Sequence, residues 1–313
     1  MAQRVTNAMM INTFNRNLYR NAAKMERLQT QLATNRKIVR LSDDPIGVIK
    51  SLNARSRLAG IAQYQRNIQD AQSWLTQSES SVNELNTILK RAYELSVSLA
   101  NEVKTPEDRQ AASYELKELL DQVVTLGNAT LGDKYLFGGY NVTQAPMAVD
   151  AVSGEMTFNG FSLYDPADLA QVQALDEVIS YEIGFGTDLS VSISGVRFMG
   201  LGEDNVYHQL KTFYEQASSS TLEDLQPFVD VFQRLQGNAL ALSAEIGGRQ
   251  NRLELMTTRF EQDFINYTQM KSDAEDLDQA EAIMYFSMAE AVYRAALSVG
   301  GRILQPTLVD FLR

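Results

Sequence analysis

Hydrophobic residues recur at three- and four-residue steps along most of the chain, a spacing that predicts long helices packed side by side. In the first 33 residues this seam has one polar step, at Asn21. Its apolar members are Ile11, Phe14, Leu18, Met25, Leu28 and Leu32. Residues 34–45 break the pattern and are predicted to form a loop. Asp44 is expected to cap the next helix, with Pro45 as its first residue.

The second helical segment, about 46–103, has the most regular pattern. Seven-residue spacing relates Ile61, Ile68, Leu75, Val82 and Leu89. The intermediate positions hold Tyr64, Ala71, Ser78, Leu85, Ala92 and Leu99. As one helix, residues 61–104 would extend roughly 65 Å at 1.5 Å per residue. A further helix is predicted after Thr105, which can cap it, with Pro106 in its first turn.

The pattern changes between about residues 135 and 200, where glycine and aromatic residues become more frequent. Leu189, Val191 and Ile193 alternate with serines, and residues 179–183 alternate in the same way. A period of two predicts strands with one buried face. This region is therefore predicted to be a small β-rich insertion.

Helical character returns near residue 203. Thr221 with Asp224 resembles a capping box before the next apolar run. After Gly247–Gly248 a single long helix is predicted from about 249 to 299, with weak seam positions at Asp263, Ala274 and Glu281. The seam residues of this helix are Leu253, Met256, Phe260, Tyr267, Met270, Leu277, Met284, Met288, Ala291 and Ala295.

The predicted fold is mainly α with inserted β: long antiparallel coiled-coil helices from both chain ends plus a small β-rich central domain. Three domains follow from this reading. Residues 1–40 and 270–313 would form a terminal coiled-coil assembly domain. Residues 41–134 and 203–269 would form a helical rod domain, and residues 135–202 a β-rich domain.

Charge supports the pairing of the two chain ends. The chain carries 28 Lys and Arg against 39 Asp and Glu, a net charge of −11, which disfavours nucleic acid as a partner. Residues 1–40 hold a net +7, and residues 261–290 a net −7. Oppositely charged heptad helices are natural partners, either within one subunit or between subunits. The N-terminal seam is therefore predicted to pack against the C-terminal positions Met284, Met288, Ala291, Ala295 and Val299, where the alanines allow close approach.

Candidate chemistry is scarce. The chain has no cysteine and one histidine, His208, so neither a catalytic triad nor a His- or Cys-based metal site can be assembled. Asp43 and Asp44 fit a helix start better than acid–base work. We expect no catalytic residues, no cofactor and no metal. An enzyme with an acid-only site in the β-rich part is a distant alternative.

A membrane role is a second alternative. No stretch approaches the roughly 18 apolar residues of a membrane helix, so no membrane insertion is expected. The basic, amphipathic N-terminal segment could instead lie on a membrane surface, which would make this a membrane-surface helical protein. The N-terminus lacks the apolar core of a Sec signal peptide, so secretion would need another route.

Several short motifs resemble those of the bacterial flagellin family, which comprises flagellins and hook-associated proteins. Residues 66–71 read RNIQDA, and residues 89–95 read LKRAYEL. The loop sequence DDP at 43–45, where flagellins more often continue with Ala-Ala-Gly, resembles the hook–filament junction branch, as do SWL at 73–75 and GDKYLFGG at 132–139. The segment from Leu277 to Arg313 is similar to the family's terminal helix and short tail.

The resemblance implies a structural subunit of the flagellum that connects hook to filament. Such subunits leave the cell through the flagellar type III apparatus and assemble through their terminal helices, with the middle domain facing outward. The implied partners are further copies in a ring or filament layer, a neighbouring hook-associated protein, flagellin and an export chaperone. The major filament flagellin is the alternative within the family.

Overall fold

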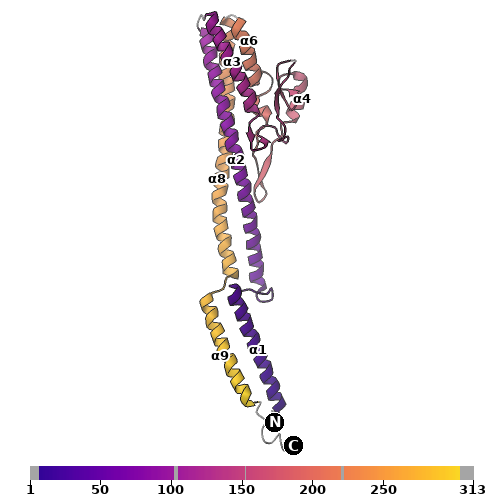
Figure 1. The fold of residues 1–313 in the computed structure, drawn as a ribbon, viewed down its shortest axis with the longest axis vertical. Coiled ribbons are helices and arrows are strands. Elements are labelled where there is room, and N and C mark those ends of the chain that lie inside the picture. Colours follow the sequence, from indigo (N-terminus) through magenta and orange to yellow (C-terminus); the bar gives the residue numbers. More distant parts are fainter. Residues whose placement is uncertain (1–6, 102–104, 152, 220–221, 304–313) are drawn as a thin grey trace, which may run out of the picture. The chain divides into compact units, whose positions relative to one another are not determined.

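A computed structural model describes residues 7–101, 105–151, 153–219 and 222–303 (Figure 1). The chain divides into two compact units. Residues 1–60 with 262–313 form one, called the terminal unit below, and residues 61–261 form the other, called the central unit. The architecture within them is mainly helical with small antiparallel sheets, which confirms the predicted fold class. The three-part domain division stays a prediction.

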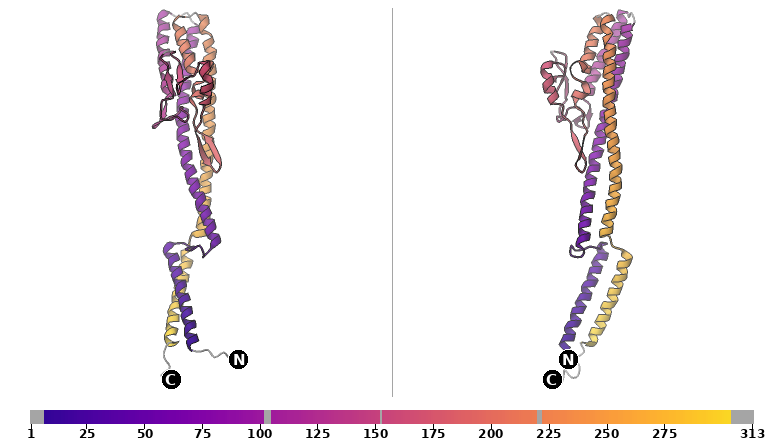
Figure 2. Two further views of the ribbon diagram at one scale, coloured as in Figure 1. Left: turned by 90° about the vertical axis from the view of Figure 1, so that its right-hand side faces the viewer. Right: turned by 180° about the vertical axis from the view of Figure 1, so that it is seen from behind.

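The terminal unit contains α1 (Asn7–Thr34), the first turns of α2 (Pro45–Asn101), the last turns of α8 (Pro227–Glu275) and α9 (Gln279–Ile303). Helices α1 and α9 lie side by side in every view (Figures 1 and 2). They are antiparallel, because Gln279 at the start of α9 bonds to Asn35, just beyond the end of α1, with an Nε2–Oδ1 distance of 2.9 Å.

The predicted single helix over 249–299 is wrong at its start and in its continuity. Helix α8 begins at Pro227 and runs through Gly247–Gly248 without a break. It ends at Glu275, and α9 begins only at Gln279. The break has a local cause: Asp278 Oδ1 accepts the backbone N–H groups of Ala280 (2.9 Å) and Glu281 (3.2 Å), which caps a new helix.

The core of the central unit confirms the predicted seam of α2. Ile61, Leu75 and Leu89 are fully buried. The partner helix is α8, which runs antiparallel to α2 (Figure 1): the Tyr64 ring stacks on Phe260, and Gln250 Nε2 donates to Glu79 Oε2 at 2.9 Å. A strict seven-residue repeat keeps the same apolar face of the helix against its partner over many turns. The repeat therefore predicts the buried face of α2 correctly.

Three shorter helices also belong to the helical part of the central unit. Helix α3 (Pro106–Gly127) packs on α6 (Val206–Ser219), and α7 (Leu222–Leu225) precedes α8. The predicted cap of α3 is confirmed as a capping box: Thr105 Oγ1 accepts the N–H of Asp108 at 3.2 Å, and Asp108 Oδ2 accepts the N–H of Thr105 at 3.3 Å. Thr221 of the other predicted box lies outside the described residues.

The β-rich part lies against α3 and α6 (Figures 1 and 2). Its first sheet pairs β1 (Thr130–Leu131) with β2 (Lys134–Tyr135), and its second has the order β3 (Met147–Val149), β4 (Met156–Phe158), β5 (Phe161–Ser162). Three short helices also belong here: α4 (Pro166–Ala174), α5 (Gly195–Met199) and the 3-10 helix η1 (Gly202–Asp204). These segments bury Phe137, Phe158 and Leu163 completely.

The third sheet is a hairpin of β6 (Ser180–Gly184) and β7 (Thr187–Ser190). Both predicted alternating segments therefore contribute a strand, although β7 ends before Val191 and Ile193, which are buried outside it. The hairpin is tied to α2, since Asn67 Nδ2 donates to the carbonyl oxygen of Glu182 at 2.7 Å.

A candidate assembly surface on the terminal helices

The seam of α1 faces α9, as predicted. Ile11, Phe14, Leu18, Met25, Leu28 and Leu32 are each half-buried, whereas Arg16 and Arg20 between them are exposed. The outer side of α1 is basic, because Arg16 and Arg20 lie away from the seam, with Lys24 on the flank next to α9. One helix therefore presents an apolar face to its partner and a cationic face to its surroundings.

On α9 the face turned to α1 differs from the predicted one. Its buried and half-buried members are Ala282, Phe286, Ala289, Tyr293, Ala296 and Gly300, again at heptad steps. At Gly300 a Cβ atom would lie 2.1 Å from Phe14 Cζ, far inside van der Waals contact. Glycine is required here because the Phe14 ring occupies the space of a side chain.

The predicted α9 positions form a second face. Met284, Met288, Ala291, Ala295 and Val299 are all exposed, with Met288 at 57% and Val299 at 54%. These positions therefore do not pack against α1 within this chain. Helix α9 carries two apolar seams at heptad spacing, and the period alone does not reveal which one the partner covers. Their role in contacts between copies stays a prediction.

These five residues are called the free face of α9 below. Tyr285 and Val292 extend it toward α1, where a hollow of about 180 Å³ is lined by Asn21, Lys24, Tyr285, Met288, Ala289 and Val292. No described segment packs over the free face. A contiguous exposed apolar helix face of this kind is typical of surfaces that contact a protein partner or a membrane.

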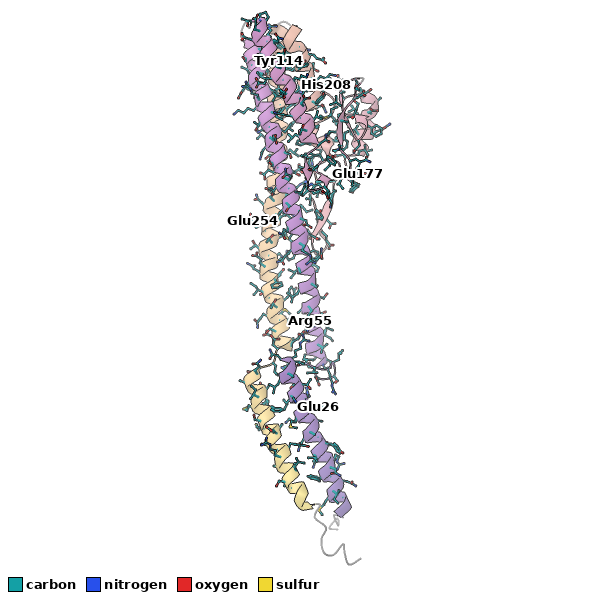
Figure 3. All side chains as sticks on the ribbon, in the orientation of Figure 1. Glu26, Arg55, Tyr114, Glu177, His208 and Glu254 are labelled. Atoms are coloured by element: carbon teal, nitrogen blue, oxygen red, sulfur yellow. The ribbon has the colours of Figure 1, made fainter. Side chains whose placement is uncertain are left out.

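A buried carboxylate organises the other half of the terminal unit. Glu275, at the end of α8, accepts hydrogen bonds from Ser51 Oγ and from Arg55 Nε at 2.7 Å. Arg55 (labelled in Figure 3) lies on α2, and this bonding raises the pKa of its guanidinium group. The Glu275 carbonyl oxygen also accepts the N–H of Lys37 at 2.7 Å, which fixes the loop after α1.

Sequence reasoning did not find this carboxylate network. In the sequence, Glu275 is simply one of eight acids in residues 261–290. Its distinguishing signal is weak: it follows Ala274, a position where the heptad seam is already interrupted. Nothing in the spacing points to Arg55, since their separation in sequence is 220 residues.

The loop acids are structural. Asp44 Oδ1 accepts the N–H of Gly47 at 3.0 Å, which confirms it as the cap of α2. Asp43 Oδ2 accepts the N–H of Arg40 at 2.9 Å, and this bond holds the pKa of the Asp43 carboxyl below its usual value. Arg27 of α1 lies 3.4 Å from Asp43 Oδ1. The two carboxylates therefore shape the loop and its contact with α1.

His208 has a packing role. Its Nδ1 lies 3.1 Å from Glu155 Oε2, and its ring stacks on Tyr164 with 3.5 Å between ring centroids. Lys211 Nζ donates to Glu155 Oε1 at 2.8 Å. These contacts fasten the hairpin of β3 and β4 onto α6, the helix on which Figure 3 labels His208. Over the described ranges, no group of three or more His, Asp or Glu side chains could hold a metal ion.

The comparisons with known proteins agree with this geometry. Residues 5–142 match the model of the bacterial flagellin N-terminal helical region. Flagellar hook-associated protein 3 of Escherichia coli is 24% identical over 306 residues, which cover 94% of both chains. A flagellin of Halalkalibacterium halodurans is 23% identical over 236 residues, 72% of this chain and 87% of that one.

The fold is shared with solved structures. The flagellar junction protein of Legionella pneumophila superposes with a TM-score of 0.57 at 13% identity, covering 72% of this chain and all of that chain. None of the helices that the structure describes has the length and hydrophobicity to cross a membrane. The chain is thus similar to flagellins over residues 5–142. Over nearly its whole length it is similar to flagellar hook-associated protein 3.

Proposed function

We propose that this chain is the subunit that joins the flagellar hook to the filament. The observation that carries the proposal is the similarity to flagellar hook-associated protein 3 over 94% of both chains. The loop sequence at Asp43–Pro45 and the Ser73–Leu75 motif favour the same branch of the family. The role is mechanical: the chain transmits force between two helical assemblies and performs no catalytic step.

Assembly proceeds through the terminal helices in this proposal. The seam of α1 is covered by α9 within one chain, so the surfaces left for other subunits are the free face of α9 and the basic outer side of α1. The partners are further copies of this chain in a ring, a neighbouring hook-associated protein and flagellin. An export chaperone holds the chain before it passes through the type III apparatus. The β-rich residues 135–202 face outward.

The competing function is that of the major filament flagellin. A flagellin relative is 23% identical over 72% of this chain. The two kinds of relative therefore have nearly the same sequence identity to this chain and differ mainly in how much of it they cover. Location in the flagellum separates them, because a junction subunit occupies one short zone whereas a flagellin occupies the filament.

Immunogold electron microscopy of isolated flagella tests the proposal. An antibody against the whole chain should label only the boundary between hook and filament, and a deletion strain serves as the control. Label along the filament would make the chain a flagellin. Absence of label from the flagella of cells that express a tagged copy would refute both functions. Binding of the purified chain to anionic liposomes would then favour the membrane-surface alternative.

A further inference from the structure

A second exposed apolar surface lies where α2 begins. Leu41 is 76% exposed in the loop, and Ile46 is 67% exposed in the first turn of α2. This surface, called the loop patch, consists of Val39, Leu41, Ile46, Ile49 and Leu52, all of them exposed. Hollows of about 290 Å³ and 250 Å³ adjoin it, and both are lined in part by Val39 and Arg40. Branched side chains beside hollows offer both knobs and holes to a partner.

The rim of the loop patch is cationic. Arg36, Arg40 and Lys50 are exposed around it. Of the nearby acids, Asp43 binds backbone amides and Arg27, and Asp44 caps α2. Glu275 bonds to Arg55, whereas Glu26, which lines the larger hollow, is exposed. An occupant that combines an apolar face with acidic neighbours would therefore gain both hydrophobic burial and electrostatic attraction.

The described part of this chain contains a segment with those properties. The free face of α9 is apolar, and residues 276–290 around its first turns hold four acids and no Lys or Arg. Two of these acids have partners in the same helix, since Asp278 caps α9 and Glu290 pairs with Arg294. The outer side of α1 fails the same test, because Arg16, Arg20 and the flanking Lys24 would repel the cationic rim. Charge therefore selects α9 over α1 as the occupant.

Side-chain size favours the same pairing. The loop patch presents the branched residues Ile49 and Leu52 on the outer side of α2, whereas the free face presents Ala291 and Ala295 beyond two methionines. Small residues on one helix leave room for large ones on the other, and methionine adapts to irregular gaps. Complementary size and charge make the two surfaces a matched pair.

We propose that the loop patch of one copy receives the free face of α9 from a second copy of this chain. The inference rests on the proposed function, because it names the surfaces through which the subunits assemble. The contact joins two different surfaces, so it repeats from subunit to subunit and closes into a ring when the rotation allows.

Disulfide crosslinking tests the contact without background, since the chain has no cysteine of its own. Cells would produce an Ile49→Cys copy together with a second copy of different size that carries one cysteine on α9. The free-face positions are Met284→Cys, Met288→Cys, Ala291→Cys and Ala295→Cys. Matched controls on another side of the same helix are Ile283→Cys and Leu297→Cys, which are also exposed. Flagella are isolated, oxidised and scored for the mixed dimer.

The expected result is a mixed dimer several-fold more abundant at free-face positions than at the control positions. Flagella that contain both copies but give no mixed dimer, or give equal yields on both sides of α9, would overturn the inference and leave the proposed function intact. Absence of both copies from flagella, with normal expression, would refute the proposed function and the inference with it. A dimer of the α9 variant with a different flagellar protein would assign the free face to that partner and also overturn the inference.

Discussion

Arg55 and Glu275 form a bidentate ion pair, with an Nε–Oε1 distance of 2.7 Å and an Nη2–Oε2 distance of 2.5 Å. The carboxylate side chain is 9% exposed, and the guanidinium side chain 42%. Because the acid is buried, loss of its partner leaves a charge with little solvent to replace it. The pair therefore holds the end of α8 against α2 and, through the Glu275 carbonyl, the loop at Lys37.

Arg55→Ala should loosen this region. We expect a local loss of about 1–2 kcal/mol, the lower part of the range for hydrogen bonds to charged groups, because Arg55 is partly solvated. The Lys37 amide, which donates to the Glu275 carbonyl, should exchange its hydrogen roughly ten-fold faster. Lys50→Ala, an exposed substitution on the same helix, is the control. Equal exchange rates in both variants would contradict the role assigned to the pair.

Two adjacent glycines of α9 should respond in opposite directions to alanine. At Gly300 the new Cβ would collide with Phe14, whereas at Gly301 no atom lies within 4 Å of it. Gly301→Ala should stabilise the helix by about 0.5–1 kcal/mol through backbone entropy. Gly300→Ala should lose that gain and destabilise the α1–α9 pair, and Phe14→Ala should relieve the collision. Hydrogen exchange of α1 amides measures all three, and similar effects of the two glycine substitutions would rule out the close approach.

A charge on the free face should block assembly without unfolding the chain. Ala295 is exposed, so Ala295→Asp removes no internal contact but places a carboxylate on an apolar docking surface. Leu18→Asp, in the half-buried seam, should damage the α1–α9 pair itself. Motility and incorporation into flagella report assembly, and circular dichroism reports folding. Ile283→Asp, at an exposed position on another side of α9, is the control, and normal incorporation of Ala295→Asp would exclude the free face as an interface.

The central unit should show an acid-dependent contribution from Glu245. Arg197 Nη2 donates to Glu245 Oε2 at 2.6 Å, and this bond lowers the pKa of the carboxyl below its usual 4.5. A carboxyl with a lowered folded-state pKa stabilises the fold fully above its unfolded-state pKa, and the contribution is lost as pH falls through the folded-state pKa. Since the side chain is 37% exposed, the effect should be below about 1 kcal/mol.

Urea unfolding of the wild type and of Glu245→Gln between pH 7 and pH 3 measures this contribution. The difference in unfolding free energy should be constant from pH 7 to about pH 5 and shrink at lower pH. A difference that does not change over the whole range would show that the ionised carboxylate contributes nothing.

Local signals in the sequence were sufficient for much of the fold. The seven-residue repeat of α2 predicts its buried face because any other face would expose Ile61, Leu75 and Leu89 together. The caps at Asp44 and Thr105 follow from residues within one helical turn. The break between α8 and α9 was missed, because an aspartate such as Asp278 is equally common on helix surfaces, and only its bonds to the next amides reveal a cap.

The assembly surface was harder to predict for a different reason. The seam of α1 has one apolar face and was identified correctly, whereas α9 is apolar on two sides, so the partner's shape decides which side is covered. The small residues Ala282, Ala289 and Gly300 gave little hydrophobic signal although they allow the closest packing. The bond between Arg55 and Glu275 depends on two distant segments meeting, which no local pattern encodes.

The fit of Phe14 against Gly300 has a consequence for alignment. Heptad seams repeat every seven residues, so two such helices could slide past each other by one repeat and still bury apolar side chains. A slip of α9 by seven residues would place Tyr293 where Gly300 now stands, directly against the Phe14 ring. Two aromatic rings cannot occupy that space. Gly300 therefore fixes the register in which α1 and α9 pack.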